Sequence, residues 1–197
     1  MVATVSIYFD TGGSDAAPAT ETDVDVLGPP NLRFKLADNP TIDTNDKLVI
    51  PASGDYYSMW KQIYLYCDNP DGNSIDNLRL YSDGTNNFGT GVDLEVGTTS
   101  PFPEKTNTSD AGYEVATKTG DSGDEMTANH AGVSAKASIF TYSEGSPLSL
   151  TISESGGVID AAGETSDYFV LQMKISDTAG PGELPVDEQL TIKYDES

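Results

Sequence analysis

Tyr168-Phe-Val-Leu-Gln-Met-Lys-Ile175 and Glu188-Gln-Leu-Thr-Ile-Lys-Tyr194 are the two stretches that decide the fold of this chain. In the first stretch, apolar side chains occupy every second position, and the second stretch alternates in the same way. A period of two is typical of β-strands that have one face on a core and the other in water. We therefore predict two strands, with Tyr168, Gln172 and Lys174 of the first facing solvent.

The connection between these two stretches, residues 176–187, argues against a tight hairpin, because it is long and contains Gly180-Pro181-Gly182. The alternative is a last strand that crosses to the second sheet of a sandwich. This strand is also a candidate sheet edge, where Lys193, Asp195 and Glu196 would prevent uncontrolled pairing. Pairing with a neighbouring subunit stays open as a further alternative.

The middle of the chain carries three more strands of the same alternating kind, at 60–67, 77–81 and 92–96. Asp71-Gly72 and Asp83-Gly84 lie between them. Turns of this composition often join antiparallel neighbours. We therefore predict that the three strands pair in sequence order as an antiparallel meander.

Seven weaker candidates lie at 4–9, 24–27, 32–36, 47–50, 113–117, 137–142 and 148–152. From these and the five stronger runs, we predict that eight to ten short strands form. Only 128–137 could carry a helical turn. This pattern predicts an all-β fold, an antiparallel β-sandwich of jelly-roll or Ig-like type with long polar loops. We expect a single domain over residues 1–197. Residues 10–23 have too few apolar side chains to pack, which predicts a mobile segment or one that contacts a neighbour.

The charge balance excludes several classes of partner. The chain has 32 acidic and 10 basic residues, a formal net charge of −22. Such a surface repels nucleic-acid phosphates and acidic membranes. No segment approaches the roughly 20 apolar residues of a membrane span, and the start lacks a secretory signal pattern. We expect a soluble chain that stays where it is made.

The single cysteine, Cys67, alternates with Ile63 and Leu65, so we expect a small buried side chain rather than a reactive thiol.

One turn-rich loop is a candidate metal site. Asp68, Asp71, Asn73 and Asp76 place four oxygen ligands close together in the sequence, and calcium takes its ligands from loops of this kind. The spacing departs from the EF-hand, and no glutamate closes the loop. The alternative is a turn whose Asp and Asn side chains bond to their own backbone. A zinc site is excluded, because one cysteine and one histidine cannot supply its ligands.

Catalytic motifs are weak. Gly120-Asp-Ser-Gly-Asp124 resembles the segment around the nucleophile of chymotrypsin-like proteases over four residues. The only histidine, His130, follows Ser122 in the same polar loop, and that family's histidine motif and disulfides are missing, so we expect an acidic turn. A hydrolase with two carboxylates stays open, because acidic residues abound.

Several aromatic side chains could stack on sugars or pair across strands: Tyr56, Tyr57, Trp60, Tyr64 and Tyr66.

Two parts of the chain resemble small virion structural proteins of tailed phages and related viruses. The first comprises Trp60–Tyr66, Asn77–Gly84 and Thr90–Gly97, and the second comprises Tyr168–Ile175, Ala179–Gly182 and Leu190–Glu196. Together they cover about a third of the chain. The resemblance implies a non-enzymatic β-sandwich that decorates or connects parts of a virus particle. It identifies no individual binding residues.

From this resemblance we expect a capsid-exterior decoration or accessory protein of the virion, assembled in the host cytoplasm. Its partners would be other virion proteins, such as the major capsid protein, and further copies of itself. We expect no nucleic acid, no membrane and no cofactor. The alternative is a secreted carbohydrate-binding or adhesin β-sandwich module, stabilised by calcium at the loop described above.

Overall fold

The chain forms two antiparallel β-sheets, and the predicted all-β sandwich class is confirmed. The computed structural model describes residues 2–24, 32–41, 45–180 and 188–197. The strands are β1 (Thr4–Thr11), β2 (Thr20–Asp23), β3 (Asp55–Tyr57), β4 (Lys61–Asn69), β5 (Ile75–Tyr81), β6 (Val92–Gly97), β7 (Lys118–Thr119), β8 (Ser122–Gly123), β9 (Lys136–Ser138), β10 (Leu148–Ser149), β11 (Phe169–Ser176) and β12 (Thr191–Glu196). The described part therefore has more strands than predicted, because five of them span only two or three residues.

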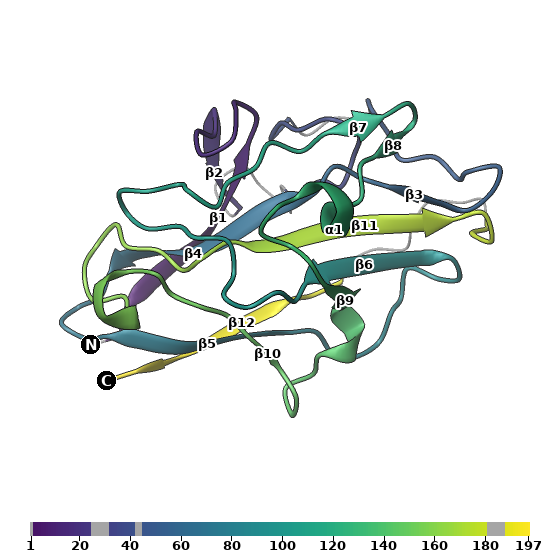
Figure 1. The fold of residues 1–197 in the computed structure, drawn as a ribbon. Helices are drawn as coiled ribbons and strands as arrows, with labels where there is room; N and C mark the ends of the chain where they lie inside the picture. Colours follow the sequence, from purple (N-terminus) through teal and green to yellow (C-terminus); the bar gives the residue numbers. More distant parts are fainter. Residues whose placement is uncertain (1, 25–31, 42–44, 181–187) are drawn as a thin grey trace.

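β11 is the central strand of the larger, nine-stranded sheet (Figure 1). Leu171 pairs with Lys61 of β4 on one edge and with Val96 of β6 on the other. Further along, Lys174 pairs with Tyr57 of β3, so that β3 and β4 share one edge of β11. The alternating run that predicted this strand thus has neighbours on both sides. Beyond β4 the sheet continues through β1 to β2.

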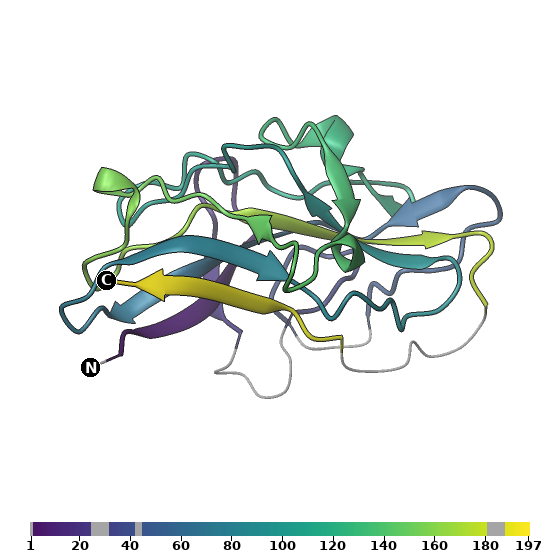
Figure 2. The same cartoon turned by 90° about the horizontal axis from the view of Figure 1, so that it is seen from below.

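The last strand crosses to the other sheet, as the long connection predicted. β12 pairs with β5 in a three-stranded sheet of order β10-β5-β12, which Figure 2 shows in front of the larger sheet. Its pairing is therefore within the chain. Near the end of β12, Asp195 accepts hydrogen bonds from Arg79 and Asn77 of β5. Most of the connection before it, residues 181–187, lies outside the described part.

The predicted meander is wrong. β4 pairs with β1 and β11, β5 pairs with β10 and β12, and β6 pairs with β11 and β9. The turns after β4 and β5 do reverse the chain, but each turn carries it to the opposite sheet. Both sheets thereby bury an apolar face, which a flat meander would leave open.

The main core lies between the two sheets. From the larger sheet it contains Phe9, Ile63, Leu65, Cys67, Leu94, Val96, Phe169 and Leu171, and from the smaller sheet Ile75, Leu78, Leu80 and Leu148. Cys67 is fully buried, as expected from its alternation with its neighbours, and burial raises the pKa of its thiol.

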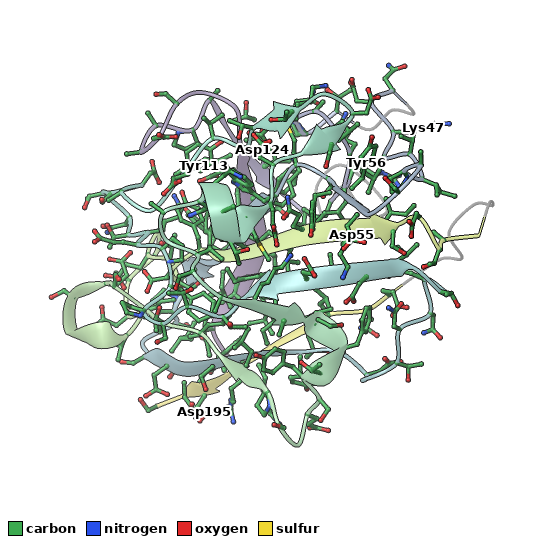
Figure 3. The ribbon with its side chains drawn as sticks, turned by 45° about the vertical axis from the view of Figure 1, so that its right-hand side comes forward. Lys47, Asp55, Tyr56, Tyr113, Asp124 and Asp195 are labelled. Carbon is green, nitrogen blue, oxygen red and sulfur yellow. The ribbon has the colours of Figure 1, made fainter. Side chains whose placement is uncertain are left out.

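The other face of the larger sheet is covered as well. The chain from β6 to β9, which includes the short helix α1 (Met126–Asn129), lies over it (Figure 1). In Figure 3, Tyr113 and Asp124 of this layer lie on one side of β11, and Asp195 lies on the other. Tyr168 and Gln172 are consequently buried, and the prediction that they face water is wrong. Lys174 is the partly exposed member of that face.

Residues 10–23 fold onto their own chain. β1 and β2 pair as an antiparallel hairpin, with Asp10 opposite Glu21. Between them, the Gly12 amide donates to Asp38 Oδ2 at 2.8 Å, and the Ala16 amide donates to the Tyr113 carbonyl at 2.8 Å. Backbone and carboxylate hydrogen bonds therefore hold this polar stretch against the chain. A mobile segment, or one that contacts a neighbour, stays a prediction.

Several weaker strand candidates have no strand in the structure. Residues 32–36, 47–50 and 113–117 are irregular, and most of 24–27 lies outside the described part. Residues 137–142 and 148–152 are strands only at their starts. Besides α1, the described residues contain two 3₁₀ turns, Ile139–Thr141 and Ser155–Gly157. Across the described ranges, no helix has the length and apolar character needed to span a membrane.

Candidate functional site

A buried ammonium group lies among three carboxylates. Lys105 Nζ lies 2.6 Å from Asp110 Oδ1, 3.2 Å from Glu21 Oε1 and 3.7 Å from Asp10 Oδ2. Only 4% of the Lys105 side chain is exposed. Asp10 belongs to β1 and Glu21 to β2, so the lysine ties the N-terminal hairpin to the segment that covers the sheet.

Two tyrosine rings complete the surroundings of this ammonium group. Lys105 Nζ lies 4.4 Å from the ring centroid of Tyr64 and 5.4 Å from that of Tyr168, a cation–π arrangement. Both phenols donate hydrogen bonds to Asp10: Tyr168 to Oδ2 at 2.5 Å and Tyr64 to Oδ1 at 3.3 Å. Both rings are buried, because Tyr64 in β4 and Tyr168, immediately before β11, face the covering layer.

Burial and charge determine the protonation states here. Burial raises the pKa of the Asp10 carboxyl to about 6, while the hydrogen bond from Tyr168 and the charge of Lys105 oppose that rise. For Lys105, burial disfavours the charged form, but the hydrogen bond to Asp110 and the neighbouring negative charges outweigh it and hold its pKa above the ordinary value. Lys105 is therefore charged at neutral pH, and Asp10 gains a proton in mildly acidic solution.

The three carboxylates resemble a metal site in composition. One oxygen from each of Asp10, Glu21 and Asp110 lies within 4.8 Å of the others, and hard cations such as Ca²⁺ bind sets of this kind. The ammonium group of Lys105 already contacts all three. The residues present therefore fit an internal salt bridge better than a metal ion.

A polar cavity of about 580 Å³ opens beside this cluster. Its lining consists of Glu21, Tyr64, Tyr66, Lys105, Thr106, Asn107, Thr108, Ser109, Asp110, Ala162, Gly163 and Thr165. Glu21 and Asp110 contact Lys105 through Oε1 and Oδ1, which leaves a second oxygen on each carboxylate. Thr165 is 2% exposed, and its hydroxyl has no hydrogen-bond partner among the described residues. The cavity thus combines spare acceptors with an unpaired hydroxyl, which suits a polar molecule.

An apolar cleft of about 1180 Å³ lies between the two sheets. Its apolar lining includes Val5, Ile7, Leu65, Leu80, Phe169, Leu171, Leu190 and Ile192. Ile50 also lines it and is 39% exposed, and the adjacent Val49 is 48% exposed. Leu65, Leu80, Phe169 and Leu171 are themselves buried, so the exposed apolar side chains here are Ile50 and Val49. Exposed apolar side chains at the edge of a cleft can take part in contacts with other molecules.

The structure places the predicted calcium ligands on separate parts of one turn. Asp68 lies at the end of β4 and accepts a hydrogen bond from Ser6 Oγ at 2.7 Å, and Asp76 lies in β5. Asp71 lies in the turn, and Asn73 donates to Glu196 Oε2 at 3.2 Å. These aspartates do not form a cluster like that of Asp10, Glu21 and Asp110, and the calcium loop stays a prediction.

The alternative interpretation of this turn has direct support. The Asp71 amide donates to Asn69 Oδ1 at 3.0 Å, which is an Asx side chain bonded to the backbone two residues on. Asp71 itself has a positive φ of 56°, a conformation that Asp and Asn adopt more readily than most residues.

Ser122 and His130 have separate partners. Ser122 Oγ accepts a hydrogen bond from the Tyr57 amide at 3.0 Å and donates to the Gly123 carbonyl at 2.9 Å. His130 Nδ1 accepts from the Gly132 amide at 3.1 Å, and burial lowers the pKa of His130. The serine is thus held in the β7–β8 hairpin and has no hydrogen bond to the histidine.

The five candidate aromatic residues do not share one surface. Tyr64 and Tyr66 both contact the ring of Tyr8 on the neighbouring strand, at centroid distances of 5.9 and 5.0 Å. Trp60 is buried under the covering layer, where its indole N–H donates to the Glu114 carbonyl at 3.0 Å. Cross-strand pairing, one of the two interpretations from the sequence, therefore describes Tyr64 and Tyr66.

Sequence reasoning did not single out the Lys105 cluster, because its members lie far apart in the chain and only folding brings them together. The fold and the site define the class of this protein as an all-β sandwich with an internal salt-bridge cluster beneath a polar cavity. Comparisons of the chain with protein-family models, with curated proteins and with solved structures find no match.

Replacing Asp10 by Asn tests the protonation of the cluster. A carboxyl whose folded-state pKa of about 6 exceeds its ordinary value of 3.8 takes up a proton on folding. Its contribution to stability is therefore largest at low pH and is lost as the pH rises through 6. We expect the stability of the wild type relative to Asp10→Asn to fall by on the order of 2–3 kcal/mol between pH 4 and pH 7.

Urea denaturation of both proteins at several pH values measures this difference, and the comparison removes contributions common to both. The charged groups around Asp10 are Lys105, Glu21 and Asp110, and all three remain in the variant. A difference that is constant, or that grows with pH, contradicts the raised pKa.

Proposed function

We propose that this chain is a non-enzymatic structural protein of a virus particle, a decoration or accessory component on the capsid exterior. It acts through protein–protein contacts with other virion proteins, such as the major capsid protein, and with further copies of itself. The virion, assembled in the host cytoplasm, is its proposed location.

The observation that carries this proposal is the apolar cleft between the two sheets. Its apolar lining from the two sheets is largely buried, and exposed apolar side chains lie at Ile50, which lines it, and at the adjacent Val49, on a chain whose net charge is −22. Apolar side chains exposed beside a cleft of an otherwise charged protein can take part in contacts with other proteins or ligands. The resemblance of the alternating segments to virion proteins supplies the context for such contacts.

The charged cluster supports a structural role rather than catalysis. A raised carboxyl pKa is a recognised mark of active sites, but networks of buried ion pairs shift pKa values in the same way. The Asp10 carboxylate accepts hydrogen bonds from two phenols and faces Lys105. The polar groups of the cluster are therefore bonded to one another rather than directed at a substrate. Ser122, the other candidate, is bonded within its own hairpin.

The test has two measurements. Light scattering after size-exclusion chromatography gives the oligomeric state of the purified chain, and immunoelectron microscopy locates it on virus particles from the source culture. We expect an oligomer and labelled particle surfaces. A monomer that is absent from particles would refute the proposal.

A matched pair of variants connects the result to the cleft. Ile50→Lys places a charge in its lining, whereas Val2→Lys places the same charge at a residue that is 74% exposed and lies outside the lining. We expect the first variant to reduce assembly and the second to leave it unchanged.

A second candidate function is a secreted carbohydrate-binding or adhesin module. The polar cavity beside Lys105 is the observation that favours it. A strictly monomeric protein that binds sugars would support this function over the first.

A further inference from the structure

We propose that the polar cavity beside Lys105 binds a neutral, hydroxyl-rich molecule of the saccharide class, through Glu21, Asp110 and Asn107. The inference deepens the second candidate function by naming the residues that bind the ligand. It does not depend on the virion proposal, because a virion protein could bind a sugar with the same groups.

The two carboxylates are the principal acceptors. Each contacts Lys105 through one oxygen, at 3.2 Å for Glu21 and 2.6 Å for Asp110, and each keeps a second oxygen for a ligand. Sugar hydroxyls are good donors to carboxylates, and such charge-assisted hydrogen bonds are stronger than neutral ones. Because Lys105 is buried and holds both groups, less conformational freedom is lost when a ligand binds.

The rest of the lining supplies further polar groups. Asn107 offers an amide that can both donate and accept, from the turn closed by the Thr106–Ser109 bridge. Thr165 lines the cavity and is buried with its hydroxyl unpaired among the described residues, and a ligand hydroxyl or a water molecule in the cavity would satisfy it. Tyr66 contributes an aromatic side chain with a hydroxyl at its tip.

The charged and polar groups of the cavity favour a neutral polyol over a metal ion, an anion or an apolar ligand. A metal ion would have to displace the Lys105 ammonium group, which three carboxylates and two aromatic rings hold in place. An anion would meet Glu21 and Asp110 on a chain of net charge −22. An apolar ligand would bury these polar groups without partners. A neutral polyol avoids all three costs.

The size of the cavity is compatible with a small sugar. Its volume of about 580 Å³ lies within the range of about 300–1,000 Å³ that is typical of small-molecule sites. The cavity has a buried cation and two carboxylates that contact it, which gives the orientation-setting groups that such sites need.

The test uses the purified full chain. A glycan array identifies candidate sugars, and saturation-transfer NMR and calorimetry with the free sugar then measure binding. We expect Asn107→Ala and Glu21→Gln each to weaken binding at least about tenfold, since each removes or weakens a hydrogen bond to the ligand. Asn87→Ala is the matched control, because Asn87 is exposed and lies outside the cavity lining, and it should bind like the wild type.

Thermal unfolding of every variant checks that the fold is retained. Loss of binding in the cavity variants alone supports the inference. The absence of sugar binding, equal binding by all variants, or binding of Ca²⁺ alone overturns it. An oligomeric, particle-bound protein that binds no sugar overturns only this inference, whereas a monomer absent from particles that binds sugar through Asn107 overturns only the virion proposal.

Discussion

Lys105→Met is expected to lower the free energy of unfolding by about 3–5 kcal/mol at pH 7. The substitution keeps an apolar stem of similar length and removes the ammonium group. Asp10 then remains fully buried without its cation, near Glu21 and Asp110, which repel it. An uncompensated buried charge is far more costly than the loss of an exposed ion pair.

Urea denaturation measures this effect, and Lys193→Met is the matched control. Lys193 pairs with Glu144 at 3.4 Å, and half or more of each side chain is exposed, so we expect a change of no more than about 1 kcal/mol. The loss in Lys105→Met should shrink in mildly acidic solution, where Asp10 takes up a proton. Equal stability of the two lysine variants at pH 7 would contradict the buried salt-bridge cluster.

Gln172→Leu is expected to destabilise the protein by about 2–5 kcal/mol, although the substitution preserves most of the side-chain volume. The Gln172 amide nitrogen donates to the carbonyls of Ser58 and Asp124, both at 2.8 Å, and its oxygen accepts from the Met126 amide at 3.0 Å. Leucine leaves these backbone groups without partners, and each buried, unpaired group costs about 1–3 kcal/mol.

Urea denaturation again gives the magnitude, and hydrogen exchange gives the location, because the Met126 amide should exchange faster in the variant. Gln189→Leu is the control: Gln189 is exposed, and we expect a change within about 0.5 kcal/mol. Normal stability of Gln172→Leu would mean that the layer over β11 is not anchored through this amide.

Local alternation was a reliable guide to the strands but not to what covers them. The period of two located β4, β5, β6, β11 and β12, and the long connection before β12 correctly indicated a change of sheet. The same pattern placed Gln172 in water, because a polar residue on a strand usually faces solvent. Its burial depends on the segment between β6 and β9, whose own sequence has little periodicity. A side chain's neighbours across the fold cannot be read from its neighbours in the chain.

The pairing of the strands and the charged cluster could not be predicted from the sequence either, because both depend on contacts between residues far apart in the chain. Asp-Gly turns show that the chain reverses, but not whether the next strand joins the same sheet or the opposite one. Likewise, Lys105 and Asp10 are nearly a hundred positions apart, and neither belongs to a motif. A weak signal existed in the scarcity of basic residues, since a chain with 10 cations and 32 anions rarely leaves a cation without a partner.

The position of β11 in the chain also sets an order of events during synthesis. β4 and β6 both need β11 as a neighbour, yet residues 169–176 leave the ribosome long after residues 61–97. Until then, one edge of each earlier strand has no permanent partner in the nascent chain. Pairing over such sequence separations is slow and exposes strand edges to aggregation. Chaperones that act on the growing chain should therefore be needed most in the interval before β11 emerges.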